Sequence, residues 1–520
     1  MSKIRWYSYE HGILLLLAGV LVLSACSREQ GAAGTQAVAA PLPETGELVN
    51  AMLDTLGGRE ALEQVRVLVQ KGGGMRRHFG QIPATGAPEP PGMLTGLVET
   101  IDLANDRAAF DNSVQIGGGF AQHRTEVYTT HQGQHLGWAT TEGRPNHVTS
   151  VNGLFSWATH DTPEMLLRRN VITVALSALT AQPAVVPGER ELDGRVYWYL
   201  DTRLGEETLG LYIDQQSMRL RAWRALDTER MWGDSNTLYV LDDYRPVGAL
   251  FLPHQLEMRK DDGVYAQLRY AEISVNDDSA LDIFAIPPDV QAQAHAVLAA
   301  GEQSWVELQW VPVAEGVTQI VAFSHNSMLV EFPSFVVLIE GPYTEAQSLT
   351  LARQIEQRIG KPIRYVVPSH PHYDHTGGIR GLASVGANVL VAGGHEGELR
   401  RIVESPHSNP PDALARNLAA GVEVGQVEVF RNSSEISEGE QRLQLFEVIG
   451  IPHVSPKVLA YVPSAGALFQ SDLFFGGSGP DSRALLRAIR ELDMQVEHIV
   501  GGHGGVLPFS ALESAVAQSQ

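Results

Sequence analysis

Residues 369–378 of this 520-residue chain read Ser-His-Pro-His-Tyr-Asp-His-Thr-Gly-Gly. Within six residues the stretch places three histidines and one aspartate: His370, His372, Asp374 and His375. The preceding run, residues 363–368, is rich in β-branched and aromatic side chains, which predicts a buried strand that ends where the histidines begin. The two closing glycines let the backbone turn sharply. The stretch therefore predicts a group of ligand-type side chains on a loop at the end of a strand.

The residue types in this stretch point to a bound metal ion. A lone histidine is more often a core or surface residue than a ligand, but four such side chains within six residues reverse those odds. Neutral imidazole and carboxylate suit zinc, iron or manganese, and the lack of a thiolate argues against a structural zinc knuckle. We expect a metal site with nitrogen and oxygen ligands.

The pattern H-x-H-x-D-H is also the signature of the metallo-β-lactamase superfamily, and the chain resembles that superfamily from about Trp310 to its end. The resemblance implies an α/β fold, the αββα sandwich, with metals at one edge between the two sheets. Strand-like and helix-like runs alternate after residue 311, which fits a layered α/β arrangement. The resemblance also implies an enzyme, a metallohydrolase.

The resemblance implies further ligands at strand ends that are distant in sequence. His453, Asp472 and His503 each follow a strand-like run and match a ligand position of the superfamily. Carried over, one ion would be held by His370, His372 and His453. The second ion would be held by Asp374, His375 and His503, and Asp472 would bridge the two. The expected cofactors are two divalent ions, with zinc as the default and iron or manganese on the same ligands in relatives.

Asp374 would have a second, catalytic role in such a site. A carboxylate oxygen that does not bind metal can orient the attacking water and then pass on a proton. A pair of divalent ions lowers the pKa of a bound water, polarises the substrate oxygen and stabilises the leaving group. His325 and Asn326, at the end of another strand-like run, are weaker candidates that either line the pocket or act structurally.

Length and charge restrict the class of protein further. A chain of 520 residues predicts two or three domains, and 44% hydrophobic with 19% charged residues is typical of a globular protein. The formal net charge of −22 disfavours binding to nucleic acid, which requires a basic patch. We therefore expect a small-molecule substrate and no nucleic-acid partner.

The N-terminus predicts export and a lipid anchor. Lys3 and Arg5 precede a short apolar run, residues 13–23, which is too short to span a bilayer and reads as a signal peptide. The chain's single cysteine, Cys26, ends the sequence Leu-Ser-Ala-Cys, which resembles a bacterial lipobox whose cysteine is acylated; the alternative is an ordinary secretory signal cleaved near Ala25. The resemblance implies a lipoprotein of the cell envelope that faces the periplasm, held in the outer membrane.

Changes in composition along the chain predict its division into segments and domains. We expect a signal peptide at 1–26, a Gly/Pro/Ala-rich tether at 27–45, a mainly antiparallel β domain at 46–290, a linker at 291–305 and the hydrolase domain at 306–520. A helix is expected at 163–179 within the β domain. Phrases at 192–196, 211–214, 243–248 and 284–287 resemble the half-barrel of outer-membrane lipoprotein carriers.

These features predict a hydrolase of an ester, thioester, lactone or lactam. The absence of cysteine after residue 26 excludes the zinc β-lactamases with a thiolate ligand. Hydroxyacylglutathione hydrolases share all seven ligand types with this chain. The chain differs from them in two respects: Ser471 replaces the glycine that they usually have before the bridging aspartate, and only 17 residues follow His503 (520 − 503). The alternative is an envelope lipid- or lipoprotein-binding protein involved in trafficking, whose half-barrel carries an acyl ligand and whose metal domain is accessory.

Overall fold

The computed structural model describes residues 42–518, apart from short gaps at 78–79, 83, 85, 117–119, 132, 152–153, 156–162, 181–187, 206, 230, 262, 301–307 and 323–324. The described residues from Pro43 onward form one compact unit. The predicted signal peptide, Cys26 and most of the tether lie outside the described residues. Among the described helices, none has both the length and the apolar character that a membrane crossing requires.

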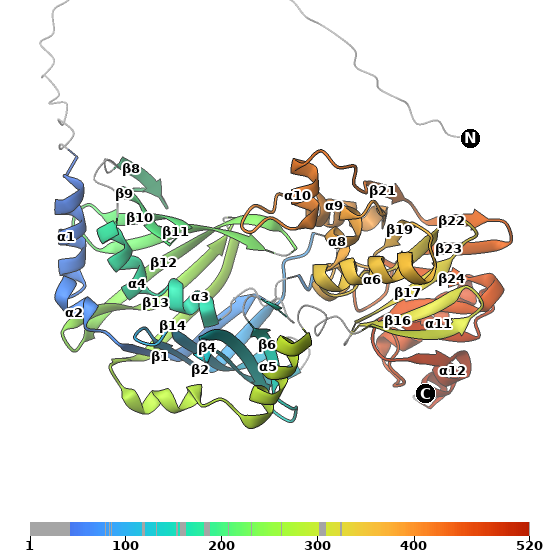
Figure 1. The fold of residues 1–520 in the computed structure, drawn as a ribbon, viewed down its shortest axis with the longest axis horizontal. Helices are drawn as coiled ribbons and strands as arrows, with labels where there is room; N and C mark the ends of the chain where they lie inside the picture. The colour runs from blue at the N-terminus through green and yellow to red at the C-terminus, as the bar shows by residue number, and fades with distance from the viewer. Residues whose placement is uncertain are drawn as a thin grey trace, which may run out of the picture. The chain divides into compact units, whose positions relative to one another are not determined.

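The N-terminal part is built on one antiparallel sheet (Figure 1). Its fourteen strands are ordered β7-β6-β5-β4-β3-β2-β1-β14-β13-β12-β11-β10-β9-β8, so each half is a run of hairpins and β1 joins β14 at the centre. The strands are β1 Val67–Arg77, β2 Pro91–Asp102, β3 Arg107–Ile116, β4 Phe120–His131, β5 Gln134–Thr141, β6 His147–Val151, β7 Leu154–Phe155, β8 Gly188–Leu192, β9 Arg195–Leu204, β10 Glu207–Asp214, β11 Leu220–Glu229, β12 Gly233–Val247, β13 Leu250–Lys260 and β14 Gly263–Val275.

Short helices cover part of this sheet. They are α1 Thr45–Thr55, α2 Arg59–Glu63, α3 Pro163–Arg168, α4 Val171–Ser177 and the short η1 Ala178–Thr180. Residues such as Met52, Leu62 and Ile172 share one core with the sheet. A second, smaller core joins β3–β6 to η2 Asp278–Phe284 and α5 Pro288–Ala300. The predicted mainly antiparallel β architecture of this region is confirmed.

The C-terminal part contains two sheets. The seven-stranded sheet has the order β15-β16-β17-β18-β19-β20-β21, and the six-stranded sheet the order β22 to β27. The strands are β15 Gln309–Ala314, β16 Val317–Ala322, β17 His325–Glu331, β18 Val336–Ile339, β19 Ile363–Val367, β20 Asn388–Ala392, β21 Val427–Phe430, β22 Ser433–Glu438, β23 Gln441–Val448, β24 Lys457–Val462, β25 Ala467–Ser471, β26 His498–Gly501 and β27 Val506–Pro508. The first sheet changes from antiparallel to parallel pairing at β18, whereas the second is antiparallel except between β25 and β26.

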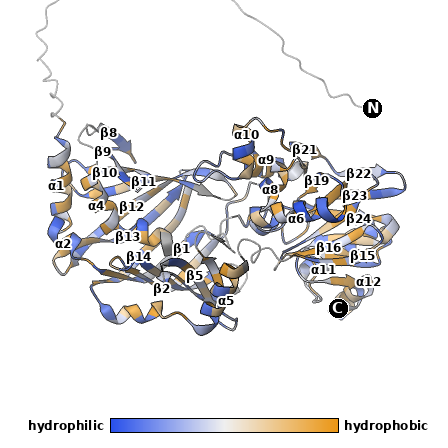
Figure 2. Cartoon of the chain, in the orientation of Figure 1, coloured by the Kyte–Doolittle hydropathy of each residue, from blue (hydrophilic) through white to orange (hydrophobic). Residues whose placement is uncertain are grey.

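Helices connect the strands of these two sheets, and the longer ones pack on the outer faces. They are α6 Glu345–Arg358, α7 Tyr373–Thr376, α8 Ile379–Ser384, the short η4 Gly393–His395, α9 Glu396–Glu404, α10 Ala413–Ala419, the short η5 Pro463–Ala465, α11 Pro480–Glu491 and α12 Phe509–Ala517. Helices α6, α8, α9 and α10 share a core with the seven-stranded sheet, and α11 and α12 share another with the six-stranded sheet. Figure 2 shows the hydrophobic residues along these strands and helices.

Alternating side chains on the strands create the layers. In β18, Val336 and Leu338 face the α6 side, while Val337 and Ile339 enter the core between the two sheets. Successive residues of a strand point to opposite faces, so a continuous apolar run identifies a strand buried on both sides. The order of layers is therefore α/β/β/α, as the resemblance implied. The predicted α/β fold class is confirmed.

The helix expected at 163–179 is two helices. Asn170 separates α3 from α4: its side chain accepts a hydrogen bond from the backbone N–H of Thr173 and donates to the carbonyls of Leu166 and Leu167. An asparagine whose side chain satisfies free backbone groups favours the start of a helix over its interior. The predicted domain limits at 290 and 306 remain a prediction; helix α5 occupies most of the expected linker.

Candidate metal centre

The predicted ligands lie at the ends of strands that meet at one edge of the two sheets. The motif of residues 369–378 follows β19, and Asp472 follows β25 directly. His453 lies in the loop between β23 and β24, and His503 follows β26. The structure brings all seven predicted side chains into overlapping groups whose candidate ligand atoms lie within 4.8 Å of one another: His370, His372, Asp374, His375, His453, Asp472 and His503.

Asp472 is at the centre of the cluster. Its Oδ2 atom lies 3.0 Å from Nε2 of His375, 3.0 Å from Nε2 of His453 and 3.3 Å from Nε2 of His370. Its Oδ1 atom lies 3.3 Å from Nε2 of His503. One carboxylate therefore faces histidines of both predicted ion sites, which is the geometry required of a bridging ligand.

The hydrogen bonding of the cluster, as far as the described residues show it, leaves several buried nitrogen atoms available for a metal ion. Among the described residues, Nε2 of His370, His375 and His453 are buried and make no hydrogen bond. Buried polar atoms are normally hydrogen-bonded, and each exception needs an explanation. Ligand atoms that share one ion at about 2.1 Å lie about 3–3.5 Å apart, which is the spacing found around Asp472. The residues fit divalent metal ions.

Glu340, at the C-terminal end of β18, orients two of the motif histidines. Its Oε2 accepts a hydrogen bond of 2.7 Å from Nδ1 of His375. Its Oε1 accepts hydrogen bonds from the hydroxyls of Ser369 and Ser471, and Ser369 Oγ lies 2.7 Å from Nδ1 of His370. With their Nδ1 atoms occupied in this way, His370 and His375 present Nε2 to the cluster, as histidine ligands commonly do.

His372 is oriented by a segment of the N-terminal part of the chain. Its Nε2 donates a hydrogen bond of 2.9 Å to the carbonyl of Ile82, which leaves Nδ1 to face the cluster. The neighbouring Gln81 donates from Nε2 to Oδ1 of Asp374 at 2.9 Å, and the N–H of Tyr373 donates to the carbonyl of Gly80. Residues 80–82 thus contact three consecutive residues of the motif.

The protonation equilibria of the cluster reflect burial and close charges. Burial lowers the pKa of His372 to about 3. Burial also lowers the pKa of His370 well below its usual value. For Asp472, burial would raise the pKa, but His375 and Lys457 together hold it well below its ordinary value. Imidazole must be unprotonated, and carboxylate ionised, to bind a cation, so the directions for His370, His372 and Asp472 favour binding. For His375, burial would lower the pKa, but the nearby carboxylates hold it well above its usual value, so a cation bound there has to displace a proton.

Two loops that carry predicted ligands are fixed by hydrogen bonds from elsewhere in the chain. The side chain of Asn326 donates to the carbonyl of Gly504, and its backbone N–H donates to the carbonyl of Gly502. A Cβ atom at Gly502 would lie 2.9 Å from Ser471 Oγ and 3.0 Å from Glu340 Oε2, so only glycine fits there. Asp481, in the first turn of α11, accepts a hydrogen bond from the N–H of His453.

Sequence reasoning missed Glu340, Lys457 and residues 81–82. Lys457 is fully buried, and among the described residues its ammonium makes no hydrogen bond, although it lies 3.8 Å from Oδ2 of Asp472. Glu340 ends an apolar strand with a left-handed φ of 61°, a signal visible only in the structure. Left-handed backbone at a residue other than glycine tends to occur at functional sites.

The layered fold and the histidine–aspartate cluster at its strand ends define the class of this part of the chain. Residues 320–511 match the family model described as the metallo-beta-lactamase superfamily. The C-terminal part of the chain thus carries a metallo-beta-lactamase superfamily domain, as the H-x-H-x-D-H pattern predicted, and all seven predicted ligands lie in the matched region.

Solved structures of metallo-beta-lactamases also align with the chain. The enzyme from Pontibacter korlensis is 20% identical with a TM-score of 0.32, and the alignment covers 41% of this chain and 100% of that one. The mono-zinc form of FIM-1 from Pseudomonas aeruginosa is 17% identical with a TM-score of 0.32, covering 41% and 94%. The protein from Hirschia baltica is 16% identical with a TM-score of 0.30, covering 40% and 96%.

Replacing Glu340 by glutamine tests its orienting role. The variant keeps the size of the side chain but removes the charge that receives the Nδ1 proton of His375. Loss of such a partner lowers metal affinity by about 10–100-fold. Equilibrium dialysis against graded zinc concentrations would measure the change, with Glu356→Gln on the exposed face of α6 as the control. Unchanged affinity in Glu340→Gln would contradict the assignment.

Proposed function

We propose that this protein is a metal-dependent hydrolase with two divalent ions, zinc by default, that opens an ester, thioester, lactone or lactam bond. The observation that carries the proposal is the arrangement around Asp472, where the buried Nε2 atoms of several histidines converge on one carboxylate. The superfamily domain at residues 320–511 supports the same reaction class. The substrate is a small molecule.

The ions would be held as the resemblance to the superfamily implies. His370, His372 and His453 would bind one ion, Asp374, His375 and His503 the other, and Asp472 both. When bound, two such ions lower the pKa of a water between them and stabilise charge on the substrate oxygen. The protein's own contribution is to hold the seven side chains rigidly, through Glu340, Ser369 and the carbonyl of Ile82.

Asp374 would handle the proton. Burial would raise the pKa of Asp374, but His375, with hydrogen bonds from His325 and His503, holds it well below its usual value. Asp374 is therefore ionised at neutral pH and can accept a proton from an attacking water and return it to the leaving group. Gln81 donates to its Oδ1 atom, which fixes the plane of the carboxylate.

The cellular setting in this proposal is the bacterial envelope. A signal peptide that ends in Leu-Ser-Ala-Cys supports acylation of Cys26 and a periplasm-facing lipoprotein, held in the outer membrane. Membrane attachment would then depend on lipid at Cys26, and radiolabelled palmitate incorporation lost in Cys26→Ala would test it. Incorporation that persists in the variant would contradict the anchor.

The experiment that tests the function is a substrate panel with metal analysis. Protein lacking the first 26 residues would be assayed with nitrocefin, acyl lactones, aryl esters and thioesters, before and after chelation. Hydrolysis of at least one class, abolished by the chelator and restored by zinc, is expected. Protein that holds two ions per chain and hydrolyses no member of the panel would contradict the reaction class.

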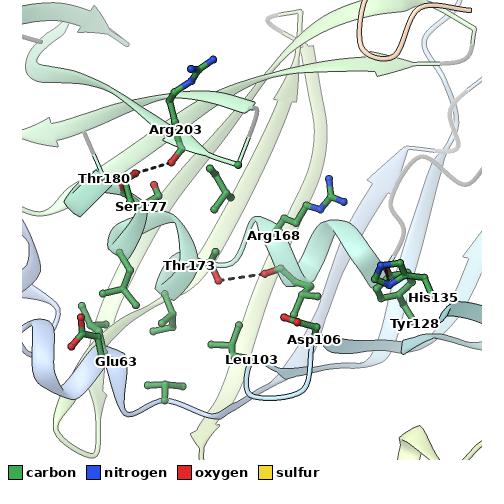
Figure 3. Close-up of a pocket in the computed structure, with 17 residues that line it drawn as sticks. Glu63, Leu103, Asp106, Tyr128, His135, Arg168, Thr173, Ser177, Thr180 and Arg203 are labelled. Atoms are coloured by element: carbon green, nitrogen blue, oxygen red, sulfur yellow. Dashed lines mark hydrogen bonds between the residues drawn. The ribbon is translucent and has the colours of Figure 1, made fainter. Parts of the chain in front are cut away.

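A cavity in the N-terminal part favours a second candidate function, an envelope lipid- or lipoprotein-binding protein with an accessory metal domain. The cavity, of about 720 Å³, lies between α3, α4 and the sheet (Figure 3). Its apolar lining includes Leu103, Leu167 and Leu176, with Arg168 and Arg203 among its polar residues. Glu63 and Asp106 also line the cavity, so its acidic and basic residues are balanced. Pockets of this size and apolar character accept small organic ligands, and an acyl chain would match the apolar lining.

Leu176→Trp would distinguish the two candidates. The larger side chain fills part of the cavity, so any lipid that co-purifies with the wild type should be reduced severalfold in the variant. Extraction followed by mass spectrometry measures bound lipid. In the hydrolase account, turnover of a small substrate stays within about twofold of the wild type, because Leu176 lies outside the metal cluster. Loss of lipid together with loss of turnover would favour the lipid-binding role.

A further inference from the structure

His325 opens strand β17 and lies beside the predicted second ion site. Only 7% of its surface is exposed. Its ring stacks on Tyr343, with centroids 5.0 Å apart and an interplanar angle of 18°. The neighbouring Asn326 anchors the loop that carries His503, as described above. The ring is therefore held in a fixed orientation by packing and by a rigid strand end.

The Nε2 atom of His325 points at the same oxygen as the predicted ligands do. It lies 3.2 Å from Oδ2 of Asp374, a hydrogen bond in this structure, whereas Nε2 of His375 lies 3.5 Å and Nε2 of His503 lies 3.6 Å from that oxygen. His325, Asp374 and His503 form a group whose ligand atoms lie within 4.8 Å of one another. The three imidazole nitrogens therefore surround one carboxylate oxygen at nearly equal distances.

Asp374 is oriented so that this oxygen faces the histidines. Gln81 donates a hydrogen bond to Oδ1, the other oxygen of the carboxylate, at 2.9 Å. Oδ2 is thereby turned toward His325, His375 and His503. Distances of 3.2–3.6 Å are close to the separation of about 3–3.5 Å expected for atoms that share one ion at about 2.1 Å, and the longest is slightly above it.

We propose that His325 is a further protein ligand of the second ion, which rests on the dinuclear site proposed above. Together with Asp374, His375, His503 and the bridging Asp472, it gives that ion five nitrogen and oxygen ligands. Zinc in catalytic sites commonly takes three protein ligands and an open fourth position. Five protein ligands with one position left for water form a six-coordinate site, which suits iron(II) or manganese(II) better than tetrahedral zinc. The two sites therefore differ in their preferred metal.

The competing role for His325 is a hydrogen-bond donor to Asp374 without metal contact. Two variants separate these roles. Glutamine keeps an N–H donor of similar reach but is a poor ligand, whereas alanine removes both functions. A ligand role predicts that His325→Gln and His325→Ala lose the second ion alike. A donor role predicts that His325→Gln retains it.

The test uses the protein without its first 26 residues, stripped of metal and titrated with cobalt(II) and manganese(II). Bound ions are counted after equilibrium dialysis, and cobalt coordination is followed by visible absorption, which strengthens as coordination number falls. In both variants we expect the first ion to stay, the dissociation constant of the second to rise by about tenfold or more, and its cobalt band to change. His407→Gln, a buried histidine 3.7 Å from Asp412 and outside the ligand groups, is the control.

Each outcome decides between the roles. Retention of the second ion with a wild-type cobalt spectrum in His325→Gln would overturn the proposal, whatever His325→Ala does. Loss of the second ion in both variants, with the first ion and the His407→Gln control unchanged, would support it. A wild type that binds no second ion would overturn both this assignment and the dinuclear site. A wild type that binds two ions, with the second ion retained in His325→Gln, would overturn only the assignment of His325 as a ligand.

Discussion

Asp374→Ala is expected to lower kcat/KM for the best panel substrate by at least about 100-fold, the lower end of the range for losing a proton-transfer group. The variant also loses a proposed ligand of the second ion, so the affinity of that ion should fall. Asp374→Asn keeps the size of the side chain and its contact with Gln81, but the neutral amide cannot accept a proton from water as a carboxylate can. We expect it to be nearly as inactive as the alanine variant. Steady-state kinetics with measured metal content would establish both effects.

The control for this pair is Asp54→Ala on the exposed face of α1. Circular dichroism and the melting temperature of each variant show whether the fold persists. If both Asp374 variants turned over substrate at the wild-type rate, neither the catalytic role nor the second ion site could be correct. If Asp374→Asn alone kept full activity, the proton-transfer role would be wrong while the ligand role could stand.

Removal of the ions is expected to lower the melting temperature of the metal-containing part of the protein by about 10 °C or more. A ligand at about 1,000 times its dissociation constant stabilises the folded state by about 4 kcal/mol per site. For a domain of about 200 residues, 1 kcal/mol corresponds to about 2–4 °C. Differential scanning calorimetry with and without chelator measures the shift, and added zinc should reverse it.

A matched variant shows whether the shift comes from this cluster. His453→Ala removes one proposed ligand. The side chain of His453 is 29% exposed and lies on a loop, so the fold should tolerate the change. Its melting temperature should respond to chelator by a clearly smaller amount than that of the wild type. An equal response in the two proteins would place the stabilising ions elsewhere.

The local sequence was enough to predict the part of the candidate site that lies on a single loop. His370, His372, Asp374 and His375 lie on one loop, and the β-branched run before them identified β19. His453, Asp472 and His503 each follow a strand-like run, but it was the resemblance to the superfamily that assigned them as ligands. The resemblance also implied the α/β/β/α layers, and strands that are apolar on both faces, such as Val336 to Ile339, are the physical reason for them.

The supporting contacts could not be predicted, since they join residues that no local pattern connects. The carbonyl of Ile82 accepts from His372 across 290 positions of sequence, and any residue type could supply a carbonyl there. Glu340 is one carboxylate among 60 acidic residues, and its function depends on a left-handed backbone at the end of β18. Lys457 sits in an apolar strand, where its pattern indicates only a core position.

The number of divalent ions bound per chain tests the central claim most directly. Metal-stripped protein without residues 1–26 would be titrated with zinc or manganese, dialysed and analysed by inductively coupled plasma mass spectrometry. Two ions per chain in the wild type, falling to one or none in Asp472→Ala, is the result that the dinuclear site predicts. Fewer than about one ion per chain in the folded wild type, at concentrations where histidine–carboxylate sites normally fill, would contradict it.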